Sequence, residues 1–253
     1  MRKIFITLLM STFCIFAKAQ ENPIISPNEK LDYEIYYAFV TGAHMTLQTE
    51  TVNENGKTLY HLIAKGNTVG LIDKIYNIME DYEAWADPET LKPVRALKNV
   101  RESAKYKRYI TYTFDHDAQT VTSTNSGTHK IPKECYDIVA ACYKIRMTDM
   151  TNLKSGQQIK FDTFFGEENW PLTLQYIKTE TVKIPKLGKI HCYKFIPVVE
   201  VSGVFTAQDA LSIWITADEN KIPVRAQMSL MVGSAKVDLV KYQNVKFPLN
   251  FKN

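Results

Sequence analysis

The 253-residue sequence lacks the side-chain spacings by which most enzymes and metalloproteins are recognised. Its five histidines are scattered without a His-x-x-x-His spacing, and there is no Gly-x-Ser-x-Gly elbow, Gly-rich phosphate loop or Cys-x-x-Cys pair. The neighbouring acids Asp115 and Asp117, and Glu167 and Glu168, occupy turn-like positions where carboxylates are ordinarily solvated. We therefore expect no enzymatic activity, no cofactor and no metal.

Long apolar runs are also scarce, except near the N-terminus. Two basic residues precede a mostly apolar run over residues 4–16, and a small-x-small cleavage site ends at Ala19. The run is shorter than the roughly 20 residues of a membrane-spanning helix, and bulky Phe13 before Cys14 argues against a lipid-modified cysteine. We therefore expect a signal peptide over 1–19, cleavage after Ala19, and an exported protein of the periplasm or cell envelope without a permanent membrane span.

Most of the excess of positive charge disappears when residues 1–19 are removed. Taking its three basic residues from the 31 of the whole chain leaves 28 basic residues against 27 acidic ones. No basic stripe remains that would attract a polyanion. Nucleic acid is therefore not an expected partner.

Cysteine is rare in the mature chain, which keeps Cys135, Cys142 and Cys192. An odd number leaves at least one thiol free unless chains pair with each other. The first two lie seven residues apart in a predicted helix, about 10.5 Å along its axis, which exceeds the roughly 7 Å limit for a disulfide. Either Cys192 pairs with one of them, or all three are small buried hydrophobes.

Alternation of apolar and polar residues dominates the rest of the chain. In the segment LDYEI, Leu31, Tyr33 and Ile35 alternate with polar residues, which is the period of a strand with one buried face. The segment NENGK over 53–57 carries the Asn-Gly signal of a tight turn. Residues 67–79 are expected to form a short irregular segment. Similar patterns predict roughly a dozen strands, among them 31–39, 43–48, 59–64, 106–114, 120–124, 158–165, 172–182, 190–201 and 237–242.

One helix is predicted within residues 132–147, beginning at Pro132 or Asp137. Arg146 falls on its apolar face. It is either a terminal arginine that complements the helix dipole or a buried cation that fixes a carboxylate or a ligand head group. The predicted apolar face comprises Cys135, Ile138, Val139 and Cys142.

A repeated motif stands on either side of this helix. The segment WADPETLKPVRA, which begins at Trp85, is matched by WITADENKIPVRA, which begins at Trp214. Both fit a strand, a polar turn and a returning strand, so they predict two equivalent hairpins. The two tryptophans, with Tyr136 and Tyr143 of the helix, belong either to a packed core or to the lining of an apolar pocket.

These patterns predict a mainly β chain with a strongly curled antiparallel sheet, an open or half barrel, and one main α-helix. The expected organisation is a signal peptide over 1–19, a flexible leader over 20–30 and a single curled β domain over 31–253.

Four segments, taken in order, resemble an uncharacterised family of exported bacterial proteins, the domain of unknown function 3108. They are LDYEIYYAFVTGAHMTL, ADPETLKPVR, YDIVAACYKIR and IWITADENKIPVRAQMSLMVGSAKVDLVKY, and the resemblance covers about residues 31–242. Membership implies no known activity. The tryptophan motif is also similar to periplasmic lipoprotein carriers, whose half barrel encloses an apolar cavity for acyl chains, although such carriers usually have more helices.

We therefore predict an exported, non-enzymatic binding protein for a lipid or other apolar ligand. The candidate ligand-binding residues are Arg146, which would orient a head group, and Tyr143, Tyr136, Trp85 and Trp214. The alternative is a cell-envelope interaction or assembly protein with a filled core and no small-molecule ligand. A carrier should contain an apolar cavity on the order of 300 Å³ or more.

Overall fold

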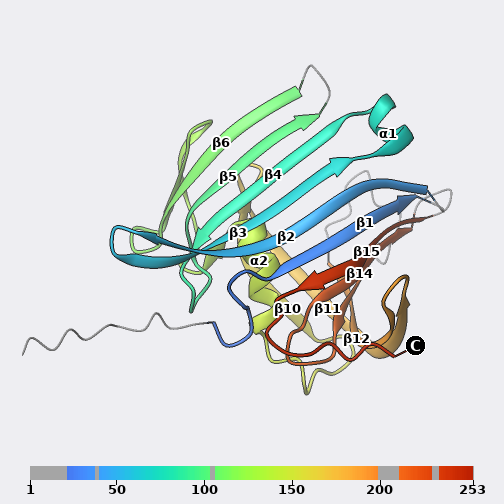
Figure 1. Ribbon diagram of the computed structural model, residues 1–253. Helices are drawn as coiled ribbons and strands as arrows, with labels where there is room; N and C mark the ends of the chain where they lie inside the picture. The colour runs from blue at the N-terminus through green and yellow to red at the C-terminus, as the bar shows by residue number, and fades with distance from the viewer. Residues whose placement is uncertain (1–21, 38–39, 103–105, 199–210, 230–233, 253) are drawn as a thin grey trace, which may run out of the picture.

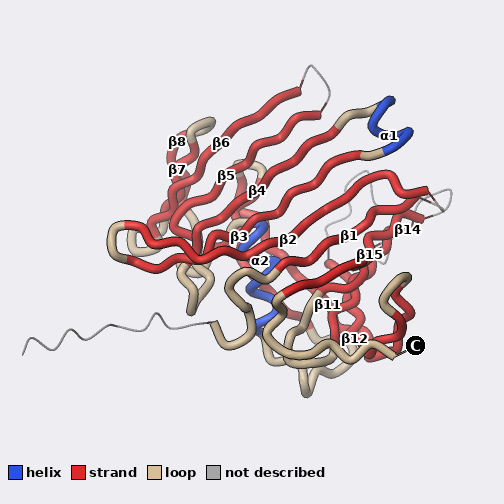
Figure 2. Tube along the Cα trace, in the orientation of Figure 1, coloured by secondary structure: helices blue, strands red, loops and turns tan. Residues whose placement is uncertain are grey.

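A computed structural model of the chain describes residues 22–37, 40–102, 106–198, 211–229 and 234–252. Within these ranges, one sheet of fifteen strands forms the molecule, antiparallel except where β9 and β10 pair (Figures 1 and 2). The predicted signal peptide and its cleavage site lie outside the described residues. The prediction of a mainly β chain with a long antiparallel sheet is confirmed.

The strands alternate with short turns along the chain. The helices are α1 (Gly70–Ile75) and α2 (Ile138–Lys144), and a 3-10 turn (Ile145–Met147) follows α2. The strands are β1 (Lys30–Tyr37), β2 (Val40–Glu54), β3 (Lys57–Thr68), β4 (Ile78–Ala86), β5 (Pro93–Glu102), β6 (Tyr106–Asp115), β7 (Thr120–Ser123), β8 (Gly127–Lys130), β9 (Cys135–Tyr136), β10 (Gln158–Phe165), β11 (Glu168–Ile184), β12 (Gly188–Pro197), β13 (Leu211–Thr216), β14 (Pro223–Ser229) and β15 (Ser234–Gln243).

Two meanders of six strands each make up most of the sheet. The strands β1 to β6 are neighbours in chain order, and so are β10 to β15. Antiparallel pairing of β1 with β15 joins the two meanders side by side. The segment from β7 to α2 connects them along the chain, and the two copies of the sequence repeat form the fourth and fifth strands of their meanders, β4–β5 and β13–β14.

The sheet is open: β8 and β9 are its edge strands, and no pairing between them closes it within the described ranges. It bends across α2, and the Glu167 carboxylate beside β11 accepts hydrogen bonds from Tyr112, Ser123 and Ser126 of the β6–β8 side. It is nevertheless not a closed or strongly curled barrel. The helix and packed side chains occupy the space between its halves, among them Leu62, Ala84, Val139 and Phe164.

Helix α2 is shorter than the predicted segment and begins after Asp137, one of its two predicted starts. Asp137 is its N-cap, with Oδ1 accepting hydrogen bonds from the backbone N–H groups of Val139 and Ala140. Cys135 lies before the helix in β9, and Cys142 is exposed. The predicted apolar face is confirmed for Val139, which is buried, and for Ile138, which packs against the core. It was wrong for Cys142, which is exposed, and Cys135 is buried in β9 and not in the helix. The buried residues of α2 are Val139, Ala140, Ala141 and Tyr143.

The flexible leader expected over 20–30 is not what the structure shows for residues 22–30. Ile25 and Glu29 are fully buried. The Asn22 side chain accepts hydrogen bonds from the backbone N–H groups of Ile24 and Ile25, and the Lys246 ammonium donates to the Asn22 carbonyl oxygen. The segment has no strand or helix period in its sequence, and its order comes from these long-range contacts.

Residues 67–79, expected to be irregular, contain the end of β3, helix α1 and the start of β4. Among the described residues, no helix combines the length and apolar character needed to cross a bilayer.

Candidate functional site

The two tryptophan motifs form hairpins with the same register. Trp85 of β4 stands opposite Arg95 of β5, and Trp214 of β13 stands opposite Arg225 of β14, with a register shift directly after each tryptophan. Each tryptophan also meets a side chain of the preceding strand. The His61 ring stacks on Trp85 at 4.3 Å, and the Lys194 ammonium lies 5.1 Å from the Trp214 ring centroid.

Arg146 is a buried cation that fixes a carboxylate of the same chain. Nη1 and Nη2 donate to the two Glu29 carboxylate oxygens at 2.5 and 2.9 Å, and Nε donates to the Asn220 carbonyl oxygen at 2.9 Å. The side chains of Arg146 and Glu29 are at most 1% exposed. The guanidinium is thus engaged in fastening residues 22–30 to the core, which leaves it poorly placed to orient a ligand head group.

The two predicted tyrosines are buried near α2. The Arg146 guanidinium carbon lies 5.7 Å from the Tyr143 ring centroid, so these two predicted residues are neighbours. The Tyr136 ring packs edge-on against Phe161 with centroids 6.4 Å apart. Burial raises the pKa of Tyr136 to about 12 and raises that of Tyr143 further. The five predicted residues do not converge on one site, because Trp85 and Trp214 stand in separate meanders.

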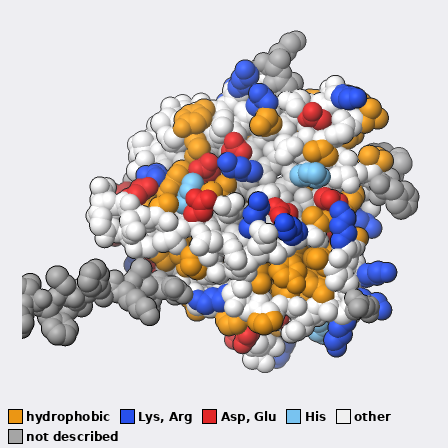
Figure 3. Space-filling model, viewed as in Figure 1, with side chains coloured by type: hydrophobic (Ala, Val, Ile, Leu, Met, Phe, Trp, Pro, Cys, Tyr) orange, Lys and Arg blue, Asp and Glu red, His pale blue; other side chains and the backbone are white. Residues whose placement is uncertain are grey.

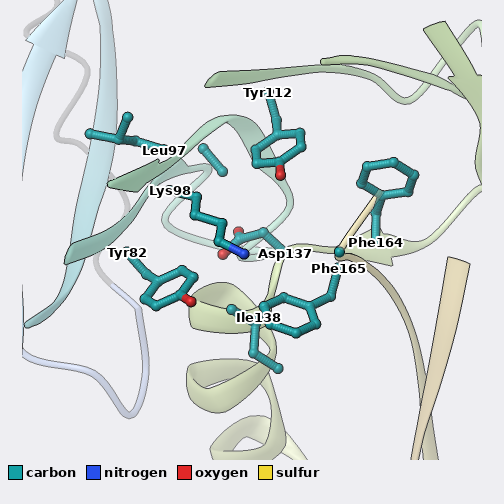
Figure 4. A pocket seen from close by; sticks show the side chains of 10 residues that line it. Tyr82, Leu97, Lys98, Tyr112, Asp137, Ile138, Phe164 and Phe165 are labelled. Atoms are coloured by element: carbon teal, nitrogen blue, oxygen red, sulfur yellow. The ribbon is translucent and has the colours of Figure 1, made fainter. Parts of the chain in front are cut away.

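A small cavity lies between α2 and the first meander (Figure 4). Lys98 and Asp137 both line it (Figure 4), and the Lys98 ammonium lies 6.0 Å from the Tyr82 ring centroid and 5.7 Å from that of Phe165. Asp137 Oδ2 is buried and has no hydrogen-bond partner among the described residues. Burial raises the pKa of Asp137 to about 7, against the opposing hydrogen bonds from the helix N–H groups. The cavity measures about 20 Å³, room for about one water molecule.

A Ser–His–Glu cluster near this cavity was not anticipated from the sequence. Ser126 Oγ lies 2.7 Å from His129 Nε2 and donates to Glu167. Glu167 Oε2 also lies 3.9 Å from that same ring nitrogen. In a catalytic triad the acid binds the ring nitrogen remote from the nucleophile. The arrangement is therefore a polar contact between the two ends of the sheet. It could not be predicted from the sequence because Ser126 and Glu167 are 41 residues apart.

Large hydrophobic side chains are exposed at one end of the first meander. Antiparallel pairing places the β1–β2, β3–β4 and β5–β6 connections at the same end of the strands, and Figure 3 shows orange side chains over α1 and blue ones beside the β5–β6 end. We call the exposed hydrophobic residues of this end the apolar rim. They are Tyr37, Val40, Leu71, Ile72, Ile75, Tyr76, Met79, Tyr106 and Tyr109.

Polar contacts hold the helix of the apolar rim in place. None of the residues in α1 is buried. The Thr68 hydroxyl donates to the Asp73 carboxylate at 2.9 Å and accepts from the Ile78 backbone N–H at 2.9 Å. Leu71 and Ile75 are 68% and 77% exposed. Their apolar surface therefore faces solvent and contributes little to folding.

The opposite end of the same strands carries polar turns. Asn55 and Gly56 both have positive φ in the β2–β3 turn, as a tight hairpin requires. In the β4–β5 turn, Asp87 Oδ1 accepts hydrogen bonds from the backbone N–H groups of Glu89 and Thr90. Val94 is the exposed large hydrophobic residue near this end. The apolar rim is thus a property of one end of the meander.

The described residues include no group of three or more histidine, cysteine, aspartate or glutamate side chains that could hold a metal ion. Cys135, Cys142 and Cys192 are free thiols. Burial raises the pKa of Cys135 and of Cys192 to about 12, so these two behave as small buried hydrophobes.

Comparison with known proteins adds a family and a fold. A family model described as "Protein of unknown function (DUF3108)" matches residues 32–240. No curated protein matches the chain. A crystal structure of a β-barrel-like protein of domain of unknown function DUF1849 from Brucella abortus is similar with a TM-score of 0.58 at 10% identity, covering 88% of this chain and 100% of that chain. This likeness concerns the fold alone.

A second solved structure is more distant. It is a protein of Bacteroides fragilis described as exported, with a YmcC-like fold, at 11% identity and a TM-score of 0.32, covering 87% of this chain and 99% of that chain. A TM-score this low supports no shared fold or function.

Proposed function

Since the chain belongs to the DUF3108 family of proteins of unknown function, we propose from its geometry that it is an exported, non-enzymatic binding protein of the cell envelope, which holds apolar partners at its apolar rim. The observation that carries this proposal is the gathering of exposed hydrophobic side chains at one end of the first meander. Export rests on the sequence of residues 1–19.

The apolar rim is a stronger candidate for the binding site than the interior of the molecule. The cavity beside Asp137 measures about 20 Å³, far less than the roughly 300 Å³ expected for a ligand pocket. An acyl chain held inside the bent sheet, as in lipoprotein carriers, would need the packed side chains around α2 to separate. A packed interior also supports the second candidate, an envelope interaction protein without a small-molecule ligand.

The hydrophobic effect would supply the affinity at the rim. Burial of a large apolar side chain contributes about 1.5–3 kcal/mol. Contiguous exposed apolar surface on a soluble protein commonly marks an interaction site, whereas single exposed hydrophobic residues do not. Nine exposed large hydrophobic side chains gather at one end of the first meander, whereas Val94 lies near the opposite end.

Binding of the neutral apolar dye Nile red to the full chain tests this proposal. Replacing Leu71 and Ile75 by serine should weaken dye binding at least about tenfold, while Val94→Ser should leave it unchanged. Neither α1 residue is buried, so the variant should fold normally. Equal loss in both variants, or no dye binding by the unmodified protein, would refute a binding role for the rim.

Mass spectrometry of an organic extract tests the natural occupancy. The protein purified from the periplasm under native conditions should carry lipid or another apolar compound in a reproducible amount. If repeated preparations carry none and Nile red does not bind, the proposed binding of apolar ligands is wrong. The second candidate function, an envelope interaction protein without a small-molecule ligand, is then favoured.

A further inference from the structure

We infer that the partner of the apolar rim is the surface of an anionic phospholipid bilayer, an inference that rests on the proposed function and names its partner. The charged side chains that are exposed at this end are basic: Lys65, Lys74, Arg101, Lys107 and Arg108. The acids of the same end, Asp73, Glu80, Asp81 and Glu102, are partly covered. An approaching flat surface therefore meets cations and apolar groups first.

An open hollow of about 480 Å³ lies within this end, between strands β4, β5 and β6. Its lining holds three basic side chains, Arg101, Lys107 and Arg108, against one acid, Asp81, and it also contains Met79 and Tyr109. Guanidinium and ammonium groups bind phosphate oxygens, and the neighbouring apolar groups suit acyl chains. A phospholipid presents both kinds of group together, whereas a simple apolar compound gives the basic residues no partner.

The shape of α1 fits insertion at a bilayer interface. Its six residues place Leu71, Ile72 and Ile75 in one short turn of helix with no residue buried. Tyr37, Tyr76, Tyr106 and Tyr109 are exposed at the same end of the meander, and tyrosine rings favour the interfacial region of a bilayer. Interfacial segments combine an apolar face with flanking Lys and Arg in this way.

Sedimentation of the full chain with vesicles tests the inference. Vesicles of phosphatidylcholine with phosphatidylglycerol should bind the protein, and vesicles of phosphatidylcholine alone should bind it at least tenfold more weakly. Binding to the anionic vesicles should weaken as the salt concentration rises, because exposed charges are screened. Soluble glycerol phosphate should not compete, because the proposed partner is the bilayer surface and not a free phosphate.

Charge reversal separates the contribution of the basic residues to vesicle binding from that of the apolar ones. The variant Arg101→Glu/Lys107→Glu/Arg108→Glu should lower affinity for anionic vesicles at least about 100-fold, because each lost positive charge costs about 1 kcal/mol and the added carboxylates repel the surface. It should still bind Nile red. Lys57→Glu, at the exposed opposite end, is the matched control and should bind as the unmodified protein does. Leu71→Ser/Ile75→Ser should lose binding to both vesicles and dye.

The outcomes distinguish the inference from the proposed function. Equal binding to neutral and anionic vesicles would overturn the anionic partner and leave an apolar binding protein. Dye binding at the rim without vesicle binding would overturn the bilayer as partner and retain the proposed function. Failure of both vesicle and dye binding would refute both. Loss of vesicle binding by Lys57→Glu equal to that of the triple variant would place the contact elsewhere.

Discussion

The hairpins β4–β5 and β13–β14 have the same motif and the same register, yet their arginines stand in different surroundings. Each arginine lies opposite its tryptophan and forms two hydrogen bonds to a carboxylate: Arg95 to Glu54, and Arg225 to Asp238. The first pair is 42% and 31% exposed, and the second is 14% and 2% exposed.

The difference shows that a sequence repeat specifies local backbone geometry and leaves the energetic role of its residues open. In both turns an aspartate accepts backbone hydrogen bonds, and a residue with positive φ stands two places before the proline, Leu91 in one hairpin and Lys221 in the other. The β13–β14 hairpin, however, lies near the seam where the two meanders join, and the β4–β5 hairpin lies away from it. Burial at the seam follows from assembly of the whole sheet.

The largest expected effect comes from breaking the buried pair. Arg225→Met should lower the free energy of unfolding by about 3–5 kcal/mol, because it leaves the Asp238 carboxylate buried without its partner. Urea unfolding followed by circular dichroism measures the loss. Adding Asp238→Asn to Arg225→Met should restore part of it, since the remaining side chain is then uncharged. A loss below about 1 kcal/mol would mean that the two hairpins are energetically equivalent.

An intermediate effect is expected from Asp137, which lies in the segment between the two meanders and outside both tryptophan hairpins. The folded-state pKa of Asp137 is raised to about 7 from an ordinary value of 3.8. A raised folded pKa gives stability that is present below the unfolded pKa and is lost as the pH rises toward the folded one. The free energy of unfolding should therefore fall by about 2–4 kcal/mol between pH 4 and pH 7 through this group.

Asp137→Asn provides the comparison, because asparagine retains the N-cap of α2. The difference in unfolding free energy between the variant and the unmodified protein, measured by urea unfolding at several pH values, should grow in favour of the variant over this range. If the unfolding free energies of the two proteins changed with pH in parallel, the pKa of Asp137 would be the same in the folded and unfolded chains, and the prediction would be wrong.

The smallest effect is expected at the exposed pair. Arg95→Met should cost about 1 kcal/mol or less, because solvent screens the ion pair with Glu54, and the Arg95 guanidinium 4.0 Å from the Trp85 ring centroid adds only a modest cation–π contact. The same urea experiment measures it. A loss as large as that of Arg225→Met would remove the distinction between the two hairpins.

The strands could be predicted from the sequence because alternation is a local property. Leu31 and Tyr33 are buried between more exposed neighbours, as the period of two requires. The hairpin after β2 follows from Asn55 and Gly56, and the equivalence of the Trp85 and Trp214 hairpins follows from the repeated letters alone. Helix α2 was predicted from periodicity with two possible starts, and the structure selects Asp137 because its carboxylate caps the helix.

The candidate site was harder to predict, because exposure at a strand end depends on what packs there. Leu71 and Ile75 have the same apolar character as core residues, and only their position beyond the sheet leaves them uncovered. Arg146 was correctly placed on the buried side of its helix, but its partner Glu29 lies 117 residues away. No local pattern connects two residues so distant in sequence.

The sequence by itself determined most of the strands, the long antiparallel sheet, the two equivalent hairpins and the resemblance to the DUF3108 family, because each depends on neighbouring residues or on repeated segments. Tertiary structure alone decided that residues 22–30 are fastened by the Arg146–Glu29 pair and that apolar side chains collect at one end of the first meander. It also decided that the arginine–carboxylate pair of one tryptophan hairpin is exposed and that of the other is buried. These features arise from contacts between strands far apart in the chain. Burial and exposure are fixed only when the whole sheet is assembled.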